Sequence, residues 1–423
     1  MSKIINVKAR EILASGGAPS IEVDVTLENG SFGRASVSYG ASAGSKEAFV
    51  LLDEDAGRYN GKGMLKAVAN VNEKIAPVIT GHDAADQRNI DKLMMEADGT
   101  ENKSNLGANA ILAVSMAVAR AAANDVHLEL YEYLSKTYSL PTTHYTLPKP
   151  MVVMIEGGKH ADNSTDLQEY LVSGLRDDLS AADNVRMQME IYEALKKILK
   201  KDGLSINVGN EGAFAPEGIA DNEKPIEFLI KAIKNTGYTL GTDAGISIDA
   251  AASEFQNQKT GKYELRIENK SLTSDELINY YKNWMEKYPF VSWEDMLSEF
   301  DWDSWPKLMA LAGNTKIVAD DLTVTNTKLW QKAIDMKAAN AILIKLNQAG
   351  TVTETVDCCL LAKKHNFATI PSHRGGGETN DTFLVDLAVA VGSEWIKVGP
   401  TRGERVSKYN RLMEIEEKLK TNS

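Results

Sequence analysis

The segment Lys316-Ile-Val-Ala-Asp320 is a short run of β-forming residues that ends in a carboxylate, and Ala341-Ile-Leu-Ile-Lys345 repeats the pattern with a lysine at its end. From residue 151 onward, such runs alternate with helical stretches. This alternation predicts a parallel β/α sheet or barrel. The predicted strands are Val152–Glu156, Leu167–Val172, Ile206–Glu211, Ile246–Asp249, Val291–Glu294, Lys316–Asp320, Ala341–Lys345, Ala368–His373 and Trp395–Lys397.

The number and spacing of these runs favour a single irregular barrel. Nine runs are one more than the eight strands of a TIM-like (β/α)8 barrel. Leu167–Val172 follows Val152–Glu156 with too little sequence between them for a helix. We therefore expect the barrel to begin with a hairpin-like pair of strands, ahead of regular strand-helix units.

The first third of the chain has a different pattern. Three alternating segments, Ile4–Leu13, Ser20–Leu27 and Phe32–Ser38, predict an antiparallel meander, and Glu28-Asn29-Gly30 is a hairpin signal. Helical periodicity follows at about 63–75, 85–96, 108–123 and 127–136. Residues 1–140 are thus predicted to form an α+β domain. The proline-rich segment Leu140–Pro150 marks the boundary, and residues 141–423 form the barrel domain.

Composition restricts the partners and the compartment. A formal net charge of -12 argues against nucleic acid or an anionic membrane as the main partner, because both are densely negative. The two cysteines, Cys358 and Cys359, are neighbours and make a poor disulfide, so we expect buried thiols in a reduced compartment. Met1–Arg10 lacks the apolar block of a signal peptide. We expect a cytoplasmic protein.

Polar side chains recur at the ends of the predicted barrel strands, where barrel enzymes carry their catalytic groups. A single aspartate after a strand is more often a helix cap or turn residue, so the recurrence is what indicates a site. The strand-end residues are Glu211, Asp249, Glu294, Asp320, Lys345, His373 and Lys397.

Three of these residues, Asp249, Glu294 and Asp320, are predicted to bind a metal. Converging carboxylates repel one another unless a cation neutralises them, and hard oxygen ligands suit Mg²⁺ better than zinc. Lys345 follows one strand later, and beside a dication its protonated form is disfavoured, so it is the candidate base. The alternative is an ordinary ion pair between Lys345 and Asp320.

The motifs of the chain resemble those of the enolase family from Ala9 to Glu417. The matching segments are Gly40-Ala-Ser-Ala-Gly44, Tyr59-Asn-Gly-Lys-Gly63, Asp98-Gly-Thr100, Leu106-Gly-Ala-Asn-Ala-Ile-Leu112, Gly157-Gly-Lys-His-Ala-Asp-Asn163, Gln168-Glu169, Glu211-Gly-Ala-Phe-Ala-Pro216, Asp249-Ala-Ala-Ala-Ser-Glu-Phe255, Asp320-Asp-Leu322, Lys345-Leu-Asn-Gln348, Ser372-His-Arg374 and Lys408-Tyr-Asn410. The resemblance implies a lyase with the enolase two-domain fold, active in glycolysis. It would reversibly dehydrate 2-phospho-D-glycerate to phosphoenolpyruvate with two Mg²⁺ ions, the second arriving with substrate.

The resemblance also implies residue roles. Lys345 would be the base, with Glu211, Glu169 and His373 as the other catalytic residues. Asp249, Glu294 and Asp320 would hold the first metal, and Ser42, in a mobile lid loop, would join the second. The substrate, a small anionic phosphorylated carboxylate, would contact His160, Gln168, Arg374, Gly375 and Lys397. A homo-oligomer, either a dimer or an octamer built as a ring of dimers, is the implied assembly.

Departures from the family pattern cluster at loops over the site. Ser372-His-Arg-Gly-Gly-Gly-Glu-Thr379 lacks the family's serine after arginine and has one extra residue, although the amides of residues 375–377 could form an anion nest. Glu156 replaces the usual asparagine, which would weaken phosphate binding if the side chain points inward. Ala14–Pro19 lacks the family's charged residues, which we expect to alter subunit contacts more than chemistry.

Milder changes lie near the working parts of the site, at Ala43, Asn210, Ala213 and Met296. Two alternatives to an enolase therefore stay open. One is a divergent lyase or epimerase that acts on another carboxylate. The other is a non-catalytic paralogue, which the intact carboxylates and lysine argue against, because buried like charges are costly.

Overall fold

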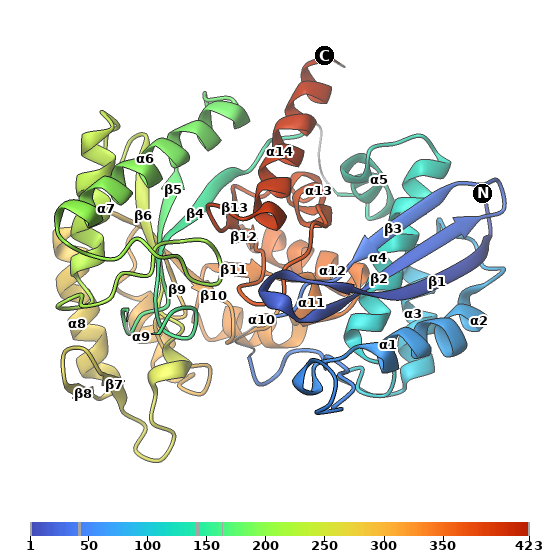
Figure 1. Cartoon of the computed structure of the whole chain (residues 1–423), viewed down its shortest axis with the longest axis horizontal. Coiled ribbons are helices and arrows are strands. Elements are labelled where there is room, and N and C mark those ends of the chain that lie inside the picture. The colour runs from blue at the N-terminus through green and yellow to red at the C-terminus, as the bar shows by residue number, and fades with distance from the viewer. Residues whose placement is uncertain (1, 41–43, 141–143, 163, 422–423) are drawn as a thin grey trace.

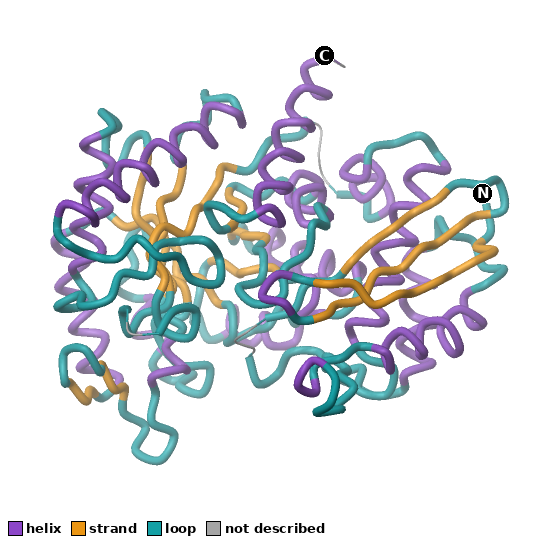
Figure 2. The backbone as a smooth tube through the Cα atoms, viewed as in Figure 1, coloured by secondary structure: helices purple, strands orange, loops and turns teal. Residues whose placement is uncertain are grey.

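The computed structural model describes residues 2–40, 44–140, 144–162 and 164–421. Ser42 and Ala43, which belong to the predicted lid, lie outside these ranges. Figure 1 shows two parts side by side, a small sheet with helices at the N-terminal end and a large barrel that contains most of the chain. Figure 2 shows the strands of the barrel gathered at its centre, with helices around them.

The N-terminal part contains the predicted meander. Strands β1 (Ile4–Leu13), β2 (Pro19–Leu27) and β3 (Phe32–Ser36) form an antiparallel sheet in that order. The alternating residues Ile21, Val23, Val25 and Leu27 are buried, as expected for a sheet with one face on the core. Beside the sheet lie α1 (Leu65–Asn70), a π turn at Val71–Ile75, α2 (Ala76–Ile79), α3 (Gln87–Asp98), α4 (Ala108–Asp125) and α5 (Leu130–Thr137).

Small side chains allow α4 to pack closely on this sheet. A Cβ atom at Gly33 of β3 would lie 2.1 Å from the Ala117 carbonyl oxygen, so only glycine fits there. No single helix in the described part of the chain is long and apolar enough to cross a membrane. The bent pair α4 and α5 meets that criterion only by length and composition, and α4 is buried between the sheet and other helices.

The barrel sheet has eight strands in the order β12-β11-β10-β9-β6-β5-β4-β13. β5 is antiparallel to both β4 and β6, and the other pairs are parallel, which confirms the predicted hairpin start. A bridge between Ser372 and Lys397 brings the two edges together, so the barrel is nearly closed. The strands are β4 (Lys149–Glu156), β5 (Glu169–Gly174), β6 (Ala244–Asp249), β9 (Phe290–Glu294), β10 (Lys316–Ala319), β11 (Ala341–Ile344), β12 (Ala368–Pro371) and β13 (Trp395–Val398).

Helices follow most of the strands and cover the barrel. They are α6 (Ala181–Lys201), α7 (Lys224–Asn235), α8 (Ser274–Lys287), α9 (Trp305–Met309), α10 (Thr327–Asp335), α11 (Leu346–Ala349), α12 (Val352–Lys364), α13 (Phe383–Ala390) and α14 (Gly403–Thr421). A small hairpin, β7 (Tyr263–Leu265) and β8 (Lys270–Leu272), lies outside the barrel. Cys358 and Cys359 are buried on α12 and unpaired, as expected.

One predicted strand, Ile206–Glu211, is wrong. This segment is a loop with a single bridge between Val208 and Phe214. Val208 is exposed, and Gly212 adopts a left-handed conformation with φ of 89°, which ends any extended run. The loss of this run reduces nine predicted strands to the eight observed.

The N-terminal part packs against the mouth of the barrel. The Thr353 amide at the start of α12 donates to Asp91 of α3 (3.0 Å), and the Val352 amide donates to Ser115 of α4 (3.0 Å). Tyr39 and Gly377 exchange backbone hydrogen bonds of 3.0 and 2.8 Å. The small domain therefore lies over the loops that follow the barrel strands.

Candidate active site

Four carboxylates form a row across four neighbouring barrel strands. The register pairs Glu156 of β4 with Glu169 of β5, Glu169 with Asp249 of β6, and Asp249 with Glu294 of β9. Glu169 is the first residue of its strand, and the antiparallel direction of β5 brings it to the end of the barrel where the parallel strands finish. The hairpin start of the barrel thus adds two acids to the strand-end set.

Lys397 is the counter-charge of this row. Its Nζ lies 2.8 Å from Glu169 Oε2, 3.0 Å from Asp249 Oδ2 and 2.7 Å from both oxygens of Glu294. Burial alone would lower the pKa of Lys397, but the three carboxylates outweigh burial and raise it well above its usual value. The lysine is therefore an ammonium ion at neutral pH.

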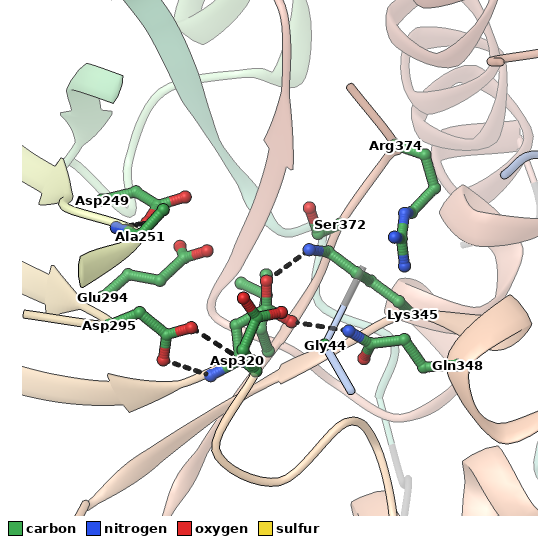
Figure 3. Close-up of polar contacts among 12 residues, drawn as sticks. Gly44, Asp249, Ala251, Glu294, Asp295, Asp320, Lys345, Gln348, Ser372 and Arg374 are labelled. Carbon is green, nitrogen blue, oxygen red and sulfur yellow. Dashed lines mark hydrogen bonds and ion pairs between the residues drawn. The ribbon is translucent and has the colours of Figure 1, made fainter. Parts of the chain in front are cut away.

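Lys345 pairs with Asp320, which is the alternative that the sequence left open. Figure 3 shows the ammonium group directed at Asp320, with Gln348 on the other side of the same carboxylate. Gln348 Nε2 donates to Asp320 Oδ1 (2.9 Å). Burial favours the neutral form of Lys345, but the charge of Asp320 dominates and raises the pKa of the lysine.

The predicted ligands Asp249, Glu294 and Asp320 offer the oxygen donors that a hard cation prefers, but among the described residues they do not form a group with all ligand atoms within 4.8 Å of one another. Asp249, Glu294 and Asp320 are buried at the same mouth, and Figure 3 shows their side chains facing a common region. Buried carboxylates require positive charge, and here Lys397 and Lys345 supply it. Oxygen ligands of this kind suit Mg²⁺, although the predicted ligand set stays a prediction.

Asp295, which the sequence did not single out, supports the loop after β10. Its Oδ1 accepts from the Asp320 amide (3.0 Å) and its Oδ2 from the Asp321 amide (2.8 Å). Asp295, Asp320 and Asp321 each bring one oxygen to within 4.8 Å of the others. Because Asp295 is occupied by two backbone amides, its observed role is to fix the position of Asp320.

A second group of titratable residues lies beside the carboxylate row. His160 Nδ1 lies 3.3 Å from Glu169 and 3.6 Å from Glu211, and His373 Nε2 lies 3.2 Å from Glu211. Burial would lower the pKa of His160, but Glu211 and Glu169 raise it to about 9. Burial dominates at His373, whose pKa is lowered. His160 is thus the protonated histidine of the pair at neutral pH.

Glu156 lies behind this group and not in the cavity. Its side chain is fully buried, and Oε1 accepts from the amides of Glu211 (3.1 Å) and Ala213 (2.9 Å). Burial and the neighbouring Glu211 raise the pKa of Glu156 to about 8. The carboxyl group is therefore largely neutral at pH 7, and it supports the loop that carries Glu211 instead of facing substrate.

Arg374 is held by an acid from the small domain. Its guanidinium donates to Glu47 Oε1 (3.1 Å) and to Asn347 Oδ1 (3.3 Å). Glu47 also accepts from Gln348 Nε2 (3.1 Å). Glu47 lies just after the predicted lid segment in the sequence. Its carboxylate therefore pairs with Arg374, the residue that was predicted to bind phosphate.

The altered loop after Arg374 contacts the altered turn between β1 and β2. Ser15 Oγ donates to the Gly376 carbonyl and accepts from the Glu378 amide, both at 2.9 Å. The Gly377 amide donates to the Tyr39 carbonyl oxygen, whereas no described residue accepts from the amides of Gly375 and Gly376. Two of the three predicted nest amides thus have no acceptor within the part of the chain that the structure describes. The segment 14–19 contacts this loop directly, and its effect on subunit contacts stays a prediction.

These residues enclose a cavity of about 20 Å³, which has room for about one water molecule. The predicted site residues that line the cavity are His160, Gln168, Glu169, Glu211, Asp249, Lys345, His373, Arg374, Gly375 and Lys397.

Ser42 lies outside the described residues. Three other contributors were not among the predicted site residues: Asn347 and Ser15 lie in segments that the sequence analysis singled out without assigning them a role, and Glu47 had no signal of its own. Their roles depend on contacts between segments that are far apart along the chain.

Comparison with known families assigns both parts of the chain. A family model described as the enolase N-terminal domain matches residues 4–134. A second model, described as the enolase C-terminal TIM barrel domain, matches residues 144–423.

Proposed function

Because this chain belongs to the enolase family, we propose that it is a Mg²⁺-dependent hydro-lyase that reversibly dehydrates 2-phospho-D-glycerate to phosphoenolpyruvate. The observation that supports this proposal most strongly is the carboxylate row at the barrel mouth with Lys345 beside it. These groups meet the main demand of the reaction. A proton next to a carboxylate is barely acidic, and its removal creates additional negative charge.

The family implies Mg²⁺, with Asp249, Glu294 and Asp320 as the residues that would hold it. When bound, the metal supplies positive charge that stabilises the ene-diolate. A lysine base combined with Mg²⁺ is an established pairing in the enolase superfamily. This part of the proposal therefore rests on family membership, and the geometry of the chain is consistent with it.

Lys345 takes the α-proton in the proposed mechanism. Asp320 holds the lysine in its charged form, so the lysine can accept a proton only when the pull of that carboxylate is offset. Gln348 and Asp295 fix Asp320 from two sides, which keeps the distance between the base and the carboxylates constant. The role of Lys397 is to face the substrate carboxylate, which replaces its contacts to Glu169 and Glu294.

The hydroxyl group leaves at the other end of the cavity. The C–O bond breaks with its electron pair on oxygen, and one proton from the Glu211 and His160 group completes a water molecule. Protonated His160, 3.6 Å from Glu211, keeps that proton beside the leaving group. The α-proton on Lys345 and the proton given to water balance the reaction.

The part of the site that was predicted to bind phosphate supports a second candidate function. The loop 375–377 lacks the family's serine, and Glu47 occupies Arg374. A divergent lyase or epimerase that acts on a carboxylate without phosphate would need neither that serine nor an arginine that binds phosphate. Glu156 adds little to this second candidate, because its side chain points at the backbone of the Glu211 loop.

A substrate comparison tests the proposal. Purified protein is incubated with Mg²⁺ and either 2-phospho-D-glycerate or D-glycerate. Ultraviolet absorbance follows the conjugated phosphoenolpyruvate, and chromatography detects pyruvate, to which the enol formed from D-glycerate tautomerises. Turnover of the phosphorylated acid alone supports the enolase reaction. Turnover of neither acid contradicts it, and turnover of D-glycerate supports the second candidate.

A further inference from the structure

The buried ring of His373 lies between a guanidinium and a carboxylate at the leaving-group end of the site. Its Nδ1 accepts a hydrogen bond from Arg405 Nε (3.1 Å), and its Nε2 lies 3.2 Å from Glu211 Oε1. A guanidinium can only donate, so His373 Nδ1 must carry a lone pair. The single proton of the neutral ring is therefore on Nε2.

The Nε2 atom of His373 is available to a ligand. His373 lines the cavity of about 20 Å³, and its Nε2 makes no hydrogen bond of acceptable geometry to any described residue. Buried polar atoms of this kind are rare in folded proteins, and a bound group that completes the site is a common reason for them. A substrate oxygen beside Glu211 would accept from this N–H group.

Arg405 is itself fixed in position. It is completely buried at the start of α14, where Nη2 donates to the Arg374 carbonyl (3.1 Å) and Nη1 pairs with Glu404. A Cβ atom at Gly399 would lie 2.7 Å from Arg405 Cδ and 2.9 Å from its Nε, so this glycine after β13 leaves the space that the arginine fills. One guanidinium thus holds both the His373 ring and the backbone of Arg374.

The two histidines beside Glu211 differ in charge because their neighbours differ. His160 faces carboxylates, which raise its pKa to about 9 against the effect of burial. Burial lowers the pKa of His373, and the charge of Arg405 lowers it further, against the opposing charges of Glu211 and Glu378. A second proton on His373 would also bring an N–H group against the N–H of Arg405.

We propose that Arg405 is a positioning residue that keeps His373 as a neutral ring with its proton on Nε2, where it donates to a substrate oxygen beside Glu211. The N–H group of a neutral imidazole is not an acid at neutral pH. Protonated His160 is then the source of the proton that converts the leaving hydroxyl to water, and it becomes neutral in that step. Only this division of roles rests on the proposed dehydration, because the state of the ring follows from contacts within the chain.

Ring ¹⁵N resonances of the full-length protein, labelled at its six histidines, test the state of the ring without any assay of activity. The His373 signals are identified by their absence from His373→Gln. In the wild type we expect an unprotonated Nδ1 and a protonated Nε2 from about pH 6 to pH 8, a range that spans the ordinary titration of histidine. A proton on Nδ1 of the wild type in this range overturns the proposal, and this result requires no variant of Arg405.

Arg405→Met tests whether the arginine is the cause. It removes the charge and the donor but keeps an unbranched side chain. The ratio of doubly to singly protonated His373 at a given pH should rise at least about tenfold, the usual effect of removing a like charge at hydrogen-bond distance. An unchanged ratio in a variant that circular dichroism shows to be folded overturns the proposal.

Arg411→Met is the matched control, because Arg411 is a mostly buried arginine of the same helix that pairs with Glu129 and Asp386. It should leave the His373 resonances unchanged, and a change as large as that in Arg405→Met overturns the proposal.

Charged groups elsewhere around the cavity are common to the wild type and both variants, so their effects cancel in these comparisons. They are His160, Glu169, Asp249, Lys345, Arg374 and Lys397. The ring assignment and the proposed reaction can also fail separately. The expected resonances in a protein without turnover would reject the dehydration alone, whereas a proton on Nδ1 in an active enzyme would reject the role of Arg405 alone.

Discussion

Lys397 Nζ lies 2.7 Å from each carboxylate oxygen of Glu294, across the mouth of the barrel from β13 to β9. The same ammonium group contacts Glu169 and Asp249. One buried lysine thus neutralises a row of acids that would otherwise repel one another. A metal ion and Lys397 are alternative sources of positive charge for these acids, which makes the stability of the protein a reporter of metal binding.

Lys397→Met should destabilise the protein strongly when metal is removed by a chelator. The lysine is almost completely buried, and removal of one partner from a buried ion pair typically costs about 3–5 kcal/mol. Added Mg²⁺ should restore much of this loss by binding the buried carboxylates that the substitution leaves without a counter-charge. Thermal unfolding in chelator and in Mg²⁺ measures both effects.

Lys149→Met is the control for that experiment. Lys149 is a mostly buried barrel lysine that pairs with Asp177 and Glu394, far from the carboxylate row along the sheet. Its loss should not be compensated by Mg²⁺. Equal compensation in both variants would show that the metal stabilises the fold generally and not through the row.

Gly375→Ser restores the residue type of the family but should reduce activity in this chain. The new Cβ atom meets His160 Nε2 at 2.5 Å and Glu211 Oε1 at 2.9 Å, so both side chains must shift. We expect kcat/KM for 2-phospho-D-glycerate to fall about tenfold, which corresponds to about 1.4 kcal/mol. Gly403→Ser, where a Cβ atom meets nothing within 4 Å, is the control. A gain in activity would contradict the geometry at His160.

Ser15→Ala should loosen the loop that follows Arg374. The substitution removes two hydrogen bonds, to Gly376 and from Glu378, and each is worth about 0.5–1.5 kcal/mol. We expect KM for the phosphorylated substrate to rise several-fold while kcat changes little, because Ser15 does not line the cavity. Ser271→Ala, which removes an exposed contact to Glu264, should leave both constants unchanged. A fall in kcat alone would argue against a role in positioning the loop.

Asp91→Asn should change how stability depends on pH. Burial raises the pKa of Asp91 to about 6, above the unfolded value of about 3.9. Because the folded pKa is the higher one, the stabilising contribution of Asp91 is complete below the unfolded pKa and is lost as pH rises through about 6.

The difference in unfolding free energy between wild type and Asp91→Asn should therefore shift by about 1.4 kcal/mol between about pH 5 and pH 7.5, to the disadvantage of the wild type. Urea unfolding at the two pH values measures it. Contributions that do not depend on pH, such as altered hydrogen bonds to Gln87 and Thr353, cancel in this comparison. A difference that is flat with pH would contradict the raised pKa.

Much of the barrel could be predicted from the sequence, because strand patterns are local. The residues at the carboxyl ends of β6, β9, β10 and β11 converge because these strands are parallel and end at one mouth. Asp249 and Glu294, the last residues of their strands, and Lys345, which follows β11, are predicted by this rule. The segment Ile206–Glu211 was wrongly predicted to be a strand because its short apolar pattern matches one. Gly209 and Gly212 instead shape it into a loop around Glu156.

Apart from the ion pair between Lys345 and Asp320, which the sequence analysis raised as an alternative, the side-chain partners were not predicted, because they depend on contacts between distant segments. No sequence pattern indicates that Glu47 pairs with Arg374 or that Ser15 donates to the Gly376 carbonyl. Nor does one indicate that Glu156 accepts from the backbone amide of Glu211. Alternation places a residue on one face of a strand, but the choice among nearby charged partners is decided only in the folded structure.

The most direct test compares wild type with Lys345→Met on 2-phospho-D-glycerate in saturating Mg²⁺, with product formation followed by ultraviolet absorbance and metal binding measured in parallel. We predict that wild type forms phosphoenolpyruvate and that the variant binds Mg²⁺ but loses at least about 10²–10⁴-fold in kcat, the usual contribution of a positioned base. No product from a folded, Mg²⁺-bound wild type, or undiminished turnover in Lys345→Met, would contradict the proposed reaction and its base.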